Sequence, residues 1–242
     1  MKYKKERALS RVPGAVLILL LACTVLQAAV KISHPPAAPR AEDLPIPPGS
    51  TVLRLASFGD PVPLAKGVML YLQAFDYQAG TRLPYQNLDY HRLIGWLTAV
   101  LQLDPGGQYP LHAASRIYAE VPDPAKQRLM LDFVYAQFFV DPGRRWPWLA
   151  HAAAVAKHRL RDLPLARRYA SAIQQHATGD NVPMWARQME IFILEDMNEL
   201  ETARVMIGGL VQSGRITHPG ELKFLEERLK SIEARLGSGA TK

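Results

Sequence analysis

Four prolines recur at near-constant intervals between residues 110 and 219, and their spacing constrains the fold more than any other feature. They are Pro110, Pro147, Pro183 and Pro219. Successive separations are 37, 36 and 36 residues. Proline is well tolerated in the first turn of a helix, where its missing N–H has no partner. Each of the four therefore predicts the start of a helix.

The first two prolines close two related stretches of sequence. These are LQLDPGGQYP over residues 101–110 and FFVDPGRRWP over residues 138–147. Both read apolar, any residue, apolar, Asp-Pro-Gly, two free positions, aromatic, Pro. We interpret each Asp-Pro-Gly as the end of one helical hairpin and each aromatic–proline pair as the beginning of the next.

Polar residues between the prolines predict a second helix start in each period. Asp123, Asp162 and Asn198 are separated by 39 and 36 residues, and Asn198 has Glu201 three residues on. Asp and Asn side chains accept hydrogen bonds from the free N–H groups of a first turn, and the Asn198–Glu201 spacing is that of a capping box. Two helix starts in about 36 residues predict a repeated helical hairpin, and periods of this length are typical of solenoids.

Apolar residues within these intervals recur every three or four positions, which is the period of a helix face. The clearest stripe is Leu222, Leu225, Leu229, Ile232 and Leu236. We expect Trp148 and Trp185 to be core residues, and Gly208-Gly209 to mark a close approach of two helices. No alternating strand pattern occurs after residue 60, so the sequence predicts an all-α fold.

The stretch WARQMEIFILEDMNELETARVMIGGLVQSG, residues 185–214, resembles a tetratricopeptide repeat (TPR), with an aromatic-led first helix, a polar turn, and Ala203 in the second helix. LQLDP and FFVDP resemble the ending of such repeats. The resemblance implies an α-solenoid of about four TPR-like helical hairpins followed by a C-terminal capping helix. The expected units are residues 64–108, 109–145, 146–182 and 183–218, with 219–236 as the closing helix. We place the whole repeat domain at 61–237 and a disordered tail at 238–242.

Residues 12–30, VPGAVLILLLACTVLQAAV, form a run of 19 residues without a charge. As a helix this run spans about 28 Å, close to the hydrocarbon thickness of a bilayer. Basic residues cluster in residues 1–11, and such residues favour the cytoplasmic side. We predict a single-pass signal anchor in a bacterial inner membrane, with the C-terminal domain in the periplasm. Two alternatives remain: a cleaved signal peptide, and a lipoprotein lipidated at Cys23 in the stretch LLAC.

Residues 31–60 contain six prolines, all between positions 35 and 48. We expect a semi-rigid spacer there. The alternative is a docking peptide that binds a polyproline-recognising groove.

The net charge also helps to define partners. Residues 1–31 carry six basic side chains and one acidic, and the remaining 211 carry 23 and 21. A nucleic-acid-binding domain would carry a basic surplus on its folded part, so we expect no nucleic-acid partner.

The sequence contains no recognised catalytic, cofactor or metal motif. His151 and His158 are seven residues apart, about 10.5 Å along a helix, too far to share one zinc ion. We therefore expect no catalytic residue, no cofactor and no metal site. The candidate residues are polar positions of first helices, which line the groove in TPR-like solenoids, and a basic turn. They are His112, Arg116, Arg144, Arg145, His151, Arg187 and Gln188.

Two functions are compatible with these features. The first is a membrane-anchored assembly or scaffold factor that binds a protein or peptide partner in the cell envelope, and the resemblance favours this interpretation. The second is an envelope enzyme on an α-solenoid scaffold, which would act on cell-wall glycan with carboxylates such as Glu120 and Asp123. An export-system lipoprotein is a further variant. The sequence indicates no oligomeric state.

Overall fold

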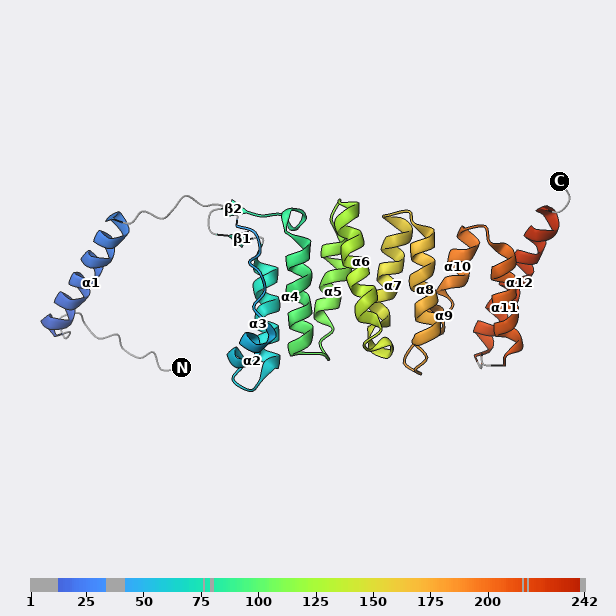
Figure 1. The fold of residues 1–242 in the computed structure, drawn as a ribbon, viewed down its shortest axis with the longest axis horizontal. Coiled ribbons are helices and arrows are strands. Elements are labelled where there is room, and N and C mark those ends of the chain that lie inside the picture. The colour runs from blue at the N-terminus through green and yellow to red at the C-terminus, as the bar shows by residue number, and fades with distance from the viewer. Residues whose placement is uncertain are drawn as a thin grey trace, which may run out of the picture. The chain divides into compact units, whose positions relative to one another are not determined.

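The computed structural model describes residues 13–33, 42–75, 77–78, 81–214, 216 and 218–239. The chain divides into two compact units, Met1–Ala41 with Ala79–Thr81, and Glu42–Gln78 with Arg82–Lys242. The described helix of the first unit is α1 (Gly14–Ser33), and the second unit contains the other helices (Figure 1). The predicted basic tail at 1–11 lies outside the described residues.

Helix α1 is a 20-residue apolar helix. Its window Gly14–Lys31 has a mean hydropathy of 2.1, and none of that window is buried. Its two hydroxyl side chains bond within the helix: the Thr24 hydroxyl donates to the Leu20 carbonyl and the Ser33 hydroxyl to the Ala29 carbonyl, both at 2.8 Å. The helix is long and apolar enough to cross a membrane, as predicted from residues 12–30. It continues to Ser33, so residues 31–33 are helical and not part of a linker.

The second unit is almost entirely helical, which confirms the predicted all-α class. Its helices are α2 (Ser50–Ala56), α3 (Pro61–Ala74), α4 (Tyr90–Leu103), α5 (Tyr109–Arg116), α6 (Pro124–Phe138), α7 (Pro142–His158), α8 (Leu163–His176), α9 (Met184–Arg187), α10 (Met189–Asp196), α11 (Leu200–Gln212) and α12 (Pro219–Gly239). Short 3-10 helices occupy Tyr85–Asn87 (η2) and Tyr118–Glu120 (η3). The strands β1 (Tyr77–Gln78) and β2 (Thr81–Arg82) pair with each other.

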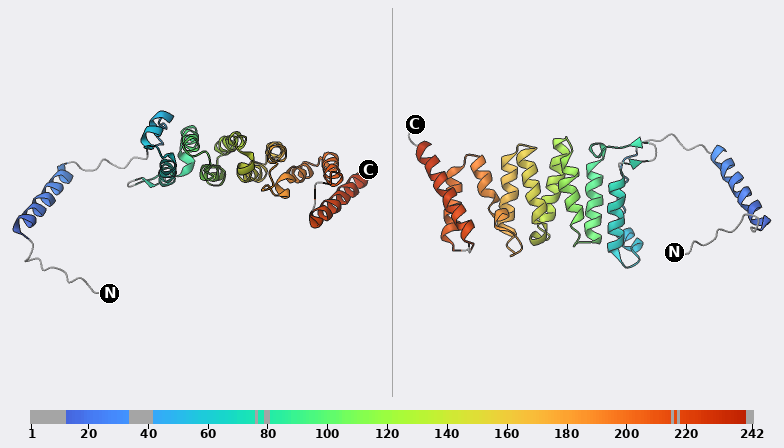
Figure 2. Two further views of the ribbon diagram at one scale, coloured as in Figure 1. Left: turned by 90° about the horizontal axis from the view of Figure 1, so that it is seen from below. Right: turned by 180° about the vertical axis from the view of Figure 1, so that it is seen from behind.

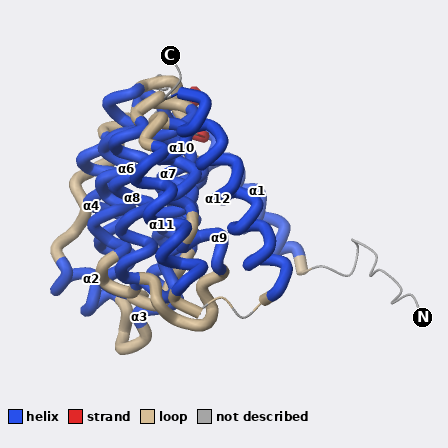
Figure 3. Tube along the Cα trace, turned by 90° about the vertical axis from the view of Figure 1, so that its right-hand side faces the viewer, coloured by secondary structure: helices blue, strands red, loops and turns tan. Residues whose placement is uncertain are grey.

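Helices of this unit pack against their neighbours in chain order. Helix α3 packs on α4, α5 on α6 and α7, α7 on α8, α8 on α10, α10 on α11, and α11 on α12. Figures 1 and 2 show the same order as a row of helices standing side by side. Loops gather at the two ends of these helices (Figure 3). A helix in such a row buries two sides of its surface, which explains why small residues such as Ala152, Ala153 and Ala156 are fully buried in α7.

Three of the four proline positions agree with predicted helix starts. Pro110 and Pro219 lie in the first turns of α5 and α12, and Pro183 is the N-cap of α9. The prediction for Pro147 is wrong, because α7 already begins at Pro142 and contains Pro147. A proline inside a helix supplies no N–H to the carbonyl four residues earlier. That carbonyl belongs to Gly143, and the Asn181 side-chain amide donates to it at 2.7 Å.

Two of the three predicted polar caps are confirmed. The Asp123 carboxylate accepts from the N–H groups of Ala125 and Lys126 at 3.0 and 3.2 Å, and the Asp162 carboxylate accepts from Leu165 N–H at 3.0 Å.

The predicted capping box at Asn198 and Glu201 is wrong. Asn198 has φ of 59° and ends the preceding helix α10, and the N-cap of α11 is Glu199, without a side-chain hydrogen bond. The Asn198 N–H donates to the Glu195 carbonyl, and the Glu199 N–H to the Leu194 carbonyl at 2.8 Å. Asparagine is tolerated in the left-handed conformation that such helix ends require, so Asn198 serves the end of one helix rather than the start of the next.

Two packing predictions are also wrong. Trp185 is 54% exposed, because α9 ends at Arg187 and α10 begins at Met189, which breaks the helical register between Trp185 and the buried Ile193. Trp148, by contrast, is half-buried and packs against other rings. At Gly208 and Gly209 an added Cβ would meet nothing within 4 Å, so no helix approaches closely there.

The proline-rich linker predicted at 31–60 needs correction over residues 42–60, which belong to the second unit. Leu44 is fully buried, Arg92 donates to its carbonyl at 2.8 Å, and the Trp96 indole N–H donates to the Pro45 carbonyl at 2.8 Å. Pro47 lies so close to Gly95 that an added Cβ there would be 2.8 Å from its ring. This segment is docked on α4, and residues 34–41 of the predicted linker lie outside the described residues. At the other terminus, α12 includes residues 238–239 of the predicted tail.

Candidate functional site

Two hollows in the surface of the helical row are the candidate site. The proximal hollow has a volume of about 630 Å³ and is lined by α3, the end of α4, and the loop and first residues of α5. The distal hollow has a volume of about 360 Å³ and is lined by α5, α7, α9 and α10. In both, most of the lining comes from the helices that the repeat period assigns to first positions.

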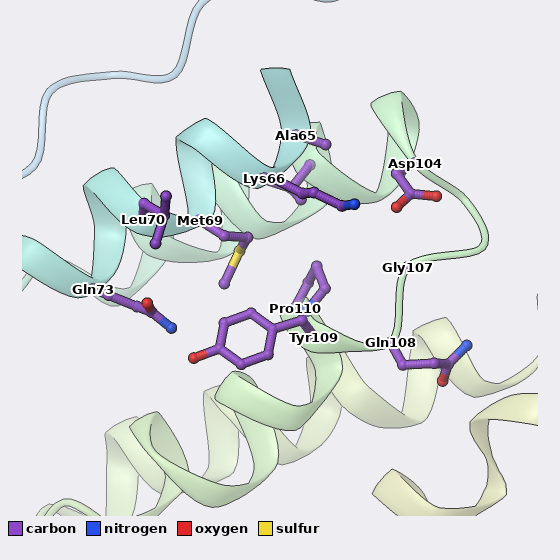
Figure 4. Close-up of a pocket in the computed structure, with 11 residues that line it drawn as sticks. Ala65, Lys66, Met69, Leu70, Gln73, Asp104, Gly107, Gln108, Tyr109 and Pro110 are labelled. Atoms are coloured by element: carbon purple, nitrogen blue, oxygen red, sulfur yellow. The ribbon is translucent and has the colours of Figure 1, made fainter. Parts of the chain in front are cut away.

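The proximal hollow has an apolar floor and a polar rim (Figure 4). Met69 and the Tyr109 ring face the same space, and Gln73 lies near the hydroxyl end of Tyr109. Lys66 lies on the side of Asp104. A hollow of this kind is suited to an apolar or aromatic side chain whose backbone can find polar partners at the rim.

Stacked rings connect the two hollows. Tyr109 of the proximal hollow stacks on His112 with ring centroids 5.6 Å apart, and His112 meets the edge of Trp148 of the distal hollow at 5.3 Å. The Trp148 indole N–H donates to the Gln108 side-chain oxygen at 2.8 Å, which fixes the ring across the two hairpin turns. The rings thus form one continuous surface between the hollows.

A pair of tryptophans forms the far wall of the distal hollow. Trp146 and Trp185 meet edge to face with centroids 5.5 Å apart, and Met189 lines the same hollow. Tyr109 and Trp185 are 42% and 54% exposed. Exposed aromatic rings grouped on one surface are typical of protein-binding sites, because rigid rings bury a large area at little cost in conformational entropy.

The charge of the distal hollow comes mainly from Arg116. Among the ion pairs of the described residues none involves Arg116, whereas the neighbouring Glu120 is held by Arg159 at 2.7 Å and lies 3.6 Å from His151. Burial lowers the pKa of the His151 imidazole, and Arg116 lowers it further, while Glu120 opposes both. The hollow therefore combines aromatic walls with the exposed Arg116 guanidinium.

The seven predicted partner residues fall into two groups. His112, Arg116 and His151 lie in or between the hollows. Gln188 is 5% exposed, and Arg187 donates to the carbonyls of Thr178 and Gly179, so both are committed to packing within the chain.

The basic turn also holds the chain together. The Arg144 guanidinium, which is exposed, donates to the Gly106 carbonyl at 2.9 Å. Arg145 is only 2% exposed; it donates to the Gln137 carbonyl and side-chain oxygen at 2.7 and 3.0 Å, and to the Pro105 carbonyl at 3.1 Å. Burial lowers the pKa of this guanidinium, and Asp141 opposes the effect. The partner-binding prediction for Arg145 is corrected, because its side chain is enclosed between two turns.

Sequence reasoning missed the aromatic residues of the hollows. Tyr109 and Trp146 directly precede the periodic prolines, and Trp185 follows Pro183 by two positions. Their recurrence beside the periodic prolines was the available signal.

The carboxylates of the enzyme alternative have structural partners. Glu120 pairs with Arg159 and lies near His151, and Asp123 caps α6. Within the described residues there is no group of three or more His, Cys, Asp or Glu that could hold a metal ion.

Comparisons with known proteins add no relative. No family model matches the chain, and neither a curated protein nor a solved structure matches it.

Proposed function

We propose that this protein is a membrane-anchored interaction factor whose two hollows bind an extended peptide segment of a partner protein in the cell envelope. The observation that carries the proposal is the aromatic surface that joins the hollows, in which Tyr109 and Trp185 are exposed and His112, Trp146 and Trp148 are half-buried. An extended peptide could place one apolar side chain in each hollow and an acidic group beside Arg116.

The proposal includes an α-solenoid of four TPR-like hairpins, α3/α4, α5/α6, α7/α8 and α9–α10/α11, with α12 as the capping helix. The support is a set of bonds between equivalent positions. Arg144 donates to the Gly106 carbonyl and Asn181 to the Gly143 carbonyl, each across 38 residues, and the Tyr169 hydroxyl meets Asp132 across 37. Bonds that recur at one sequence separation are expected when similar hairpins stack in register.

We propose further that α1 remains as the anchor in a bacterial inner membrane, with the helical unit in the periplasm. The support is the length and hydropathy of α1 together with the basic residues that precede it. A cleaved signal peptide and a lipoprotein modified at Cys23 give different masses for the membrane-extracted protein. Mass spectrometry of the intact chain separates the three forms.

In-membrane photocrosslinking tests the binding surface. A photoreactive amino acid is placed at Trp185 in one variant and at Val205 in a second, since the two side chains are 54% and 66% exposed but Val205 lies on α11, away from the hollows. We expect a discrete crosslinked partner from the Trp185 position and none from Val205. Arg116→Glu should reduce the yield at the first position without unfolding the chain. Equal yields at the two positions, or no effect of the charge reversal, would contradict the proposal.

A further inference from the structure

The two ends of the helical unit differ in the surface that they expose. Terminal elements of a helical row usually present a polar outer face, because no neighbour covers them. Helix α12 follows this rule: Leu225 and Ile232 are buried, and its exposed large apolar side chain among the described residues, Phe224, contacts the Phe192 ring. The exposed charged residues of α12 are Lys223, Glu226, Glu227, Lys230, Glu233 and Arg235.

Helix α2, at the N-terminal end, departs from the rule. It packs on α3 and α4 through the buried Leu53, and its opposite side carries Val52 and Leu55, which are 57% and 74% exposed. These two residues are three positions apart and so share one helix face. Phe58 follows directly and is 97% exposed.

The backbone at Phe58 adds a second observation. Phe58 has φ of 50°, a left-handed conformation that is rare and unfavourable for a bulky residue. Gly59, with φ of 92°, completes the turn, and Asp60 caps α3 through Val62 N–H at 3.3 Å. Because the phenyl ring is almost fully exposed, it contributes no packing within the unit that would offset the strain of the turn. Such strain is retained where the displayed group has a use outside the domain.

The position of this patch in the chain limits its distance from α1. Leu44 is docked on the helical unit, and α1 ends at Ser33, so eleven peptide steps separate them. At the reach of an extended chain those steps span at most about 40 Å. If α1 crosses a bilayer, the end of the unit that carries α2 cannot leave the neighbourhood of that bilayer. The charged residue of α2 is Arg54, which is exposed and suits anionic headgroups.

We infer that Val52, Leu55 and Phe58 form a membrane-contact patch that inserts into the interface of the bilayer crossed by α1, with Arg54 beside the headgroups. The inference rests on the anchor proposed above. As a consequence, the helical unit would be attached to the membrane at two points, α1 and the patch, and would keep a fixed orientation relative to the bilayer. The hollows are then presented to a partner at a constant height and orientation.

The test uses the full chain in vesicles of phosphatidylethanolamine and phosphatidylglycerol. In a Cys23→Ser background, which removes the single cysteine of the sequence, an environment-sensitive dye is attached through Val52→Cys in one variant and through Val205→Cys in a matched control. Both valines are exposed helix residues, at 57% and 66%. We expect lipids that carry a spin label near the headgroup to quench the dye severalfold more strongly in the Val52→Cys variant.

Adding Leu55→Ser and Phe58→Ser to the Val52→Cys variant should reduce its quenching to the control level. Loss of two partly inserted apolar side chains corresponds to at least about a tenfold fall in the bound population. Circular dichroism should be unchanged, since both side chains are exposed. Equal quenching in the two dye variants would overturn the inference, as would dye protection that depends on protein density, which would indicate a second copy.

The anchor has its own readout in the same samples. Release of the chain by alkaline carbonate would show that α1 does not span the bilayer. That result would contradict both the anchor and the membrane contact inferred for the patch. Retention without quenching in the Val52→Cys variant would overturn the patch alone.

Discussion

Replacing Arg145 by methionine should destabilise the helical unit, although the side chain lies at a turn and not in an apolar core. The guanidinium joins three oxygens on two different turns: the carbonyl and amide oxygens of Gln137, and the carbonyl of Pro105. Methionine fills much of the same volume, so Arg145→Met removes the hydrogen bonds with little loss of packing.

The expected magnitude follows from these contacts. A hydrogen bond to a charged group contributes about 1.5–3 kcal/mol, and an acceptor left buried without a donor costs about 1–3 kcal/mol. Because a buried guanidinium is itself desolvated, part of the gain is offset. We therefore expect Arg145→Met to lower the free energy of unfolding by about 3 kcal/mol.

The neighbouring arginine supplies the control. Arg144 is exposed; it makes one hydrogen bond to the Gly106 carbonyl and a solvent-exposed ion pair with Asp141 at 3.8 Å, so Arg144→Met should cost less than about 1 kcal/mol. Urea unfolding of the full chain in mild detergent, followed by tryptophan fluorescence, measures both, since all four tryptophans lie between residues 96 and 185. If the two variants were equally stable, the reasoning would be refuted: the cost of burying the guanidinium would then equal what its bonds contribute.

Three further changes test the fold in the same assay. Gly209→Ala should stabilise the unit by about 0.5–1 kcal/mol, because alanine is the better helix former and its Cβ would meet nothing within 4 Å; a destabilised variant would mean that the site is crowded. The Leu165 N–H and the Arg128 guanidinium lower the pKa of Asp162, so its stabilisation is complete above the unfolded pKa of about 3.9 and is lost as pH falls through the lower folded value. Asp162→Asn should therefore reduce the loss of stability at acid pH, and an unchanged dependence of stability on pH would show that the Asp162 carboxylate does not contribute to it. Phe58→Asn should raise stability by about 0.5–1 kcal/mol, since asparagine tolerates positive φ, while vesicle contact decreases; loss of stability would show that the ring packs in the unit.

The helical class and several helix starts could be predicted because their signals are local. A proline in a first turn or an aspartate at an N-cap acts within three residues of its own position, and Pro110, Pro219, Asp123 and Asp162 all do so. The signal failed where two local preferences competed. Asn198 can begin one helix or end another, and only the packing of α10 on α11 selects the second role.

The two Asp-Pro-Gly stretches show the same limit. After Asp104 the chain continues Pro-Gly-Gly and forms a loop, because successive glycines disfavour a helix. After Asp141 it continues Pro-Gly-Arg-Arg, and α7 starts at once. The same Asp-Pro-Gly sequence is therefore followed by a loop in one case and by a helix in the other, depending on the two residues that come after it.

The candidate site was less predictable than the fold, because exposure depends on contacts far along the chain. Arg145 and Arg116 are equally polar in the sequence. The first is buried by carbonyls up to 40 residues away, and the second lines the distal hollow. Trp148 and Trp185 were assigned to the core because helical spacing alone cannot distinguish a ring that fills an interior from one that lines a hollow.

The bonds between two pairs of turns share a backbone acceptor but differ in the side chain that donates. The acceptors Gly106 and Gly143 are 37 residues apart, and so are their donors, Arg144 and Asn181. The donors differ in charge, length and shape, yet each reaches a backbone carbonyl, and a backbone carbonyl is present whatever side chain its residue carries. A stack held in this way requires some donor at the right place rather than one particular residue.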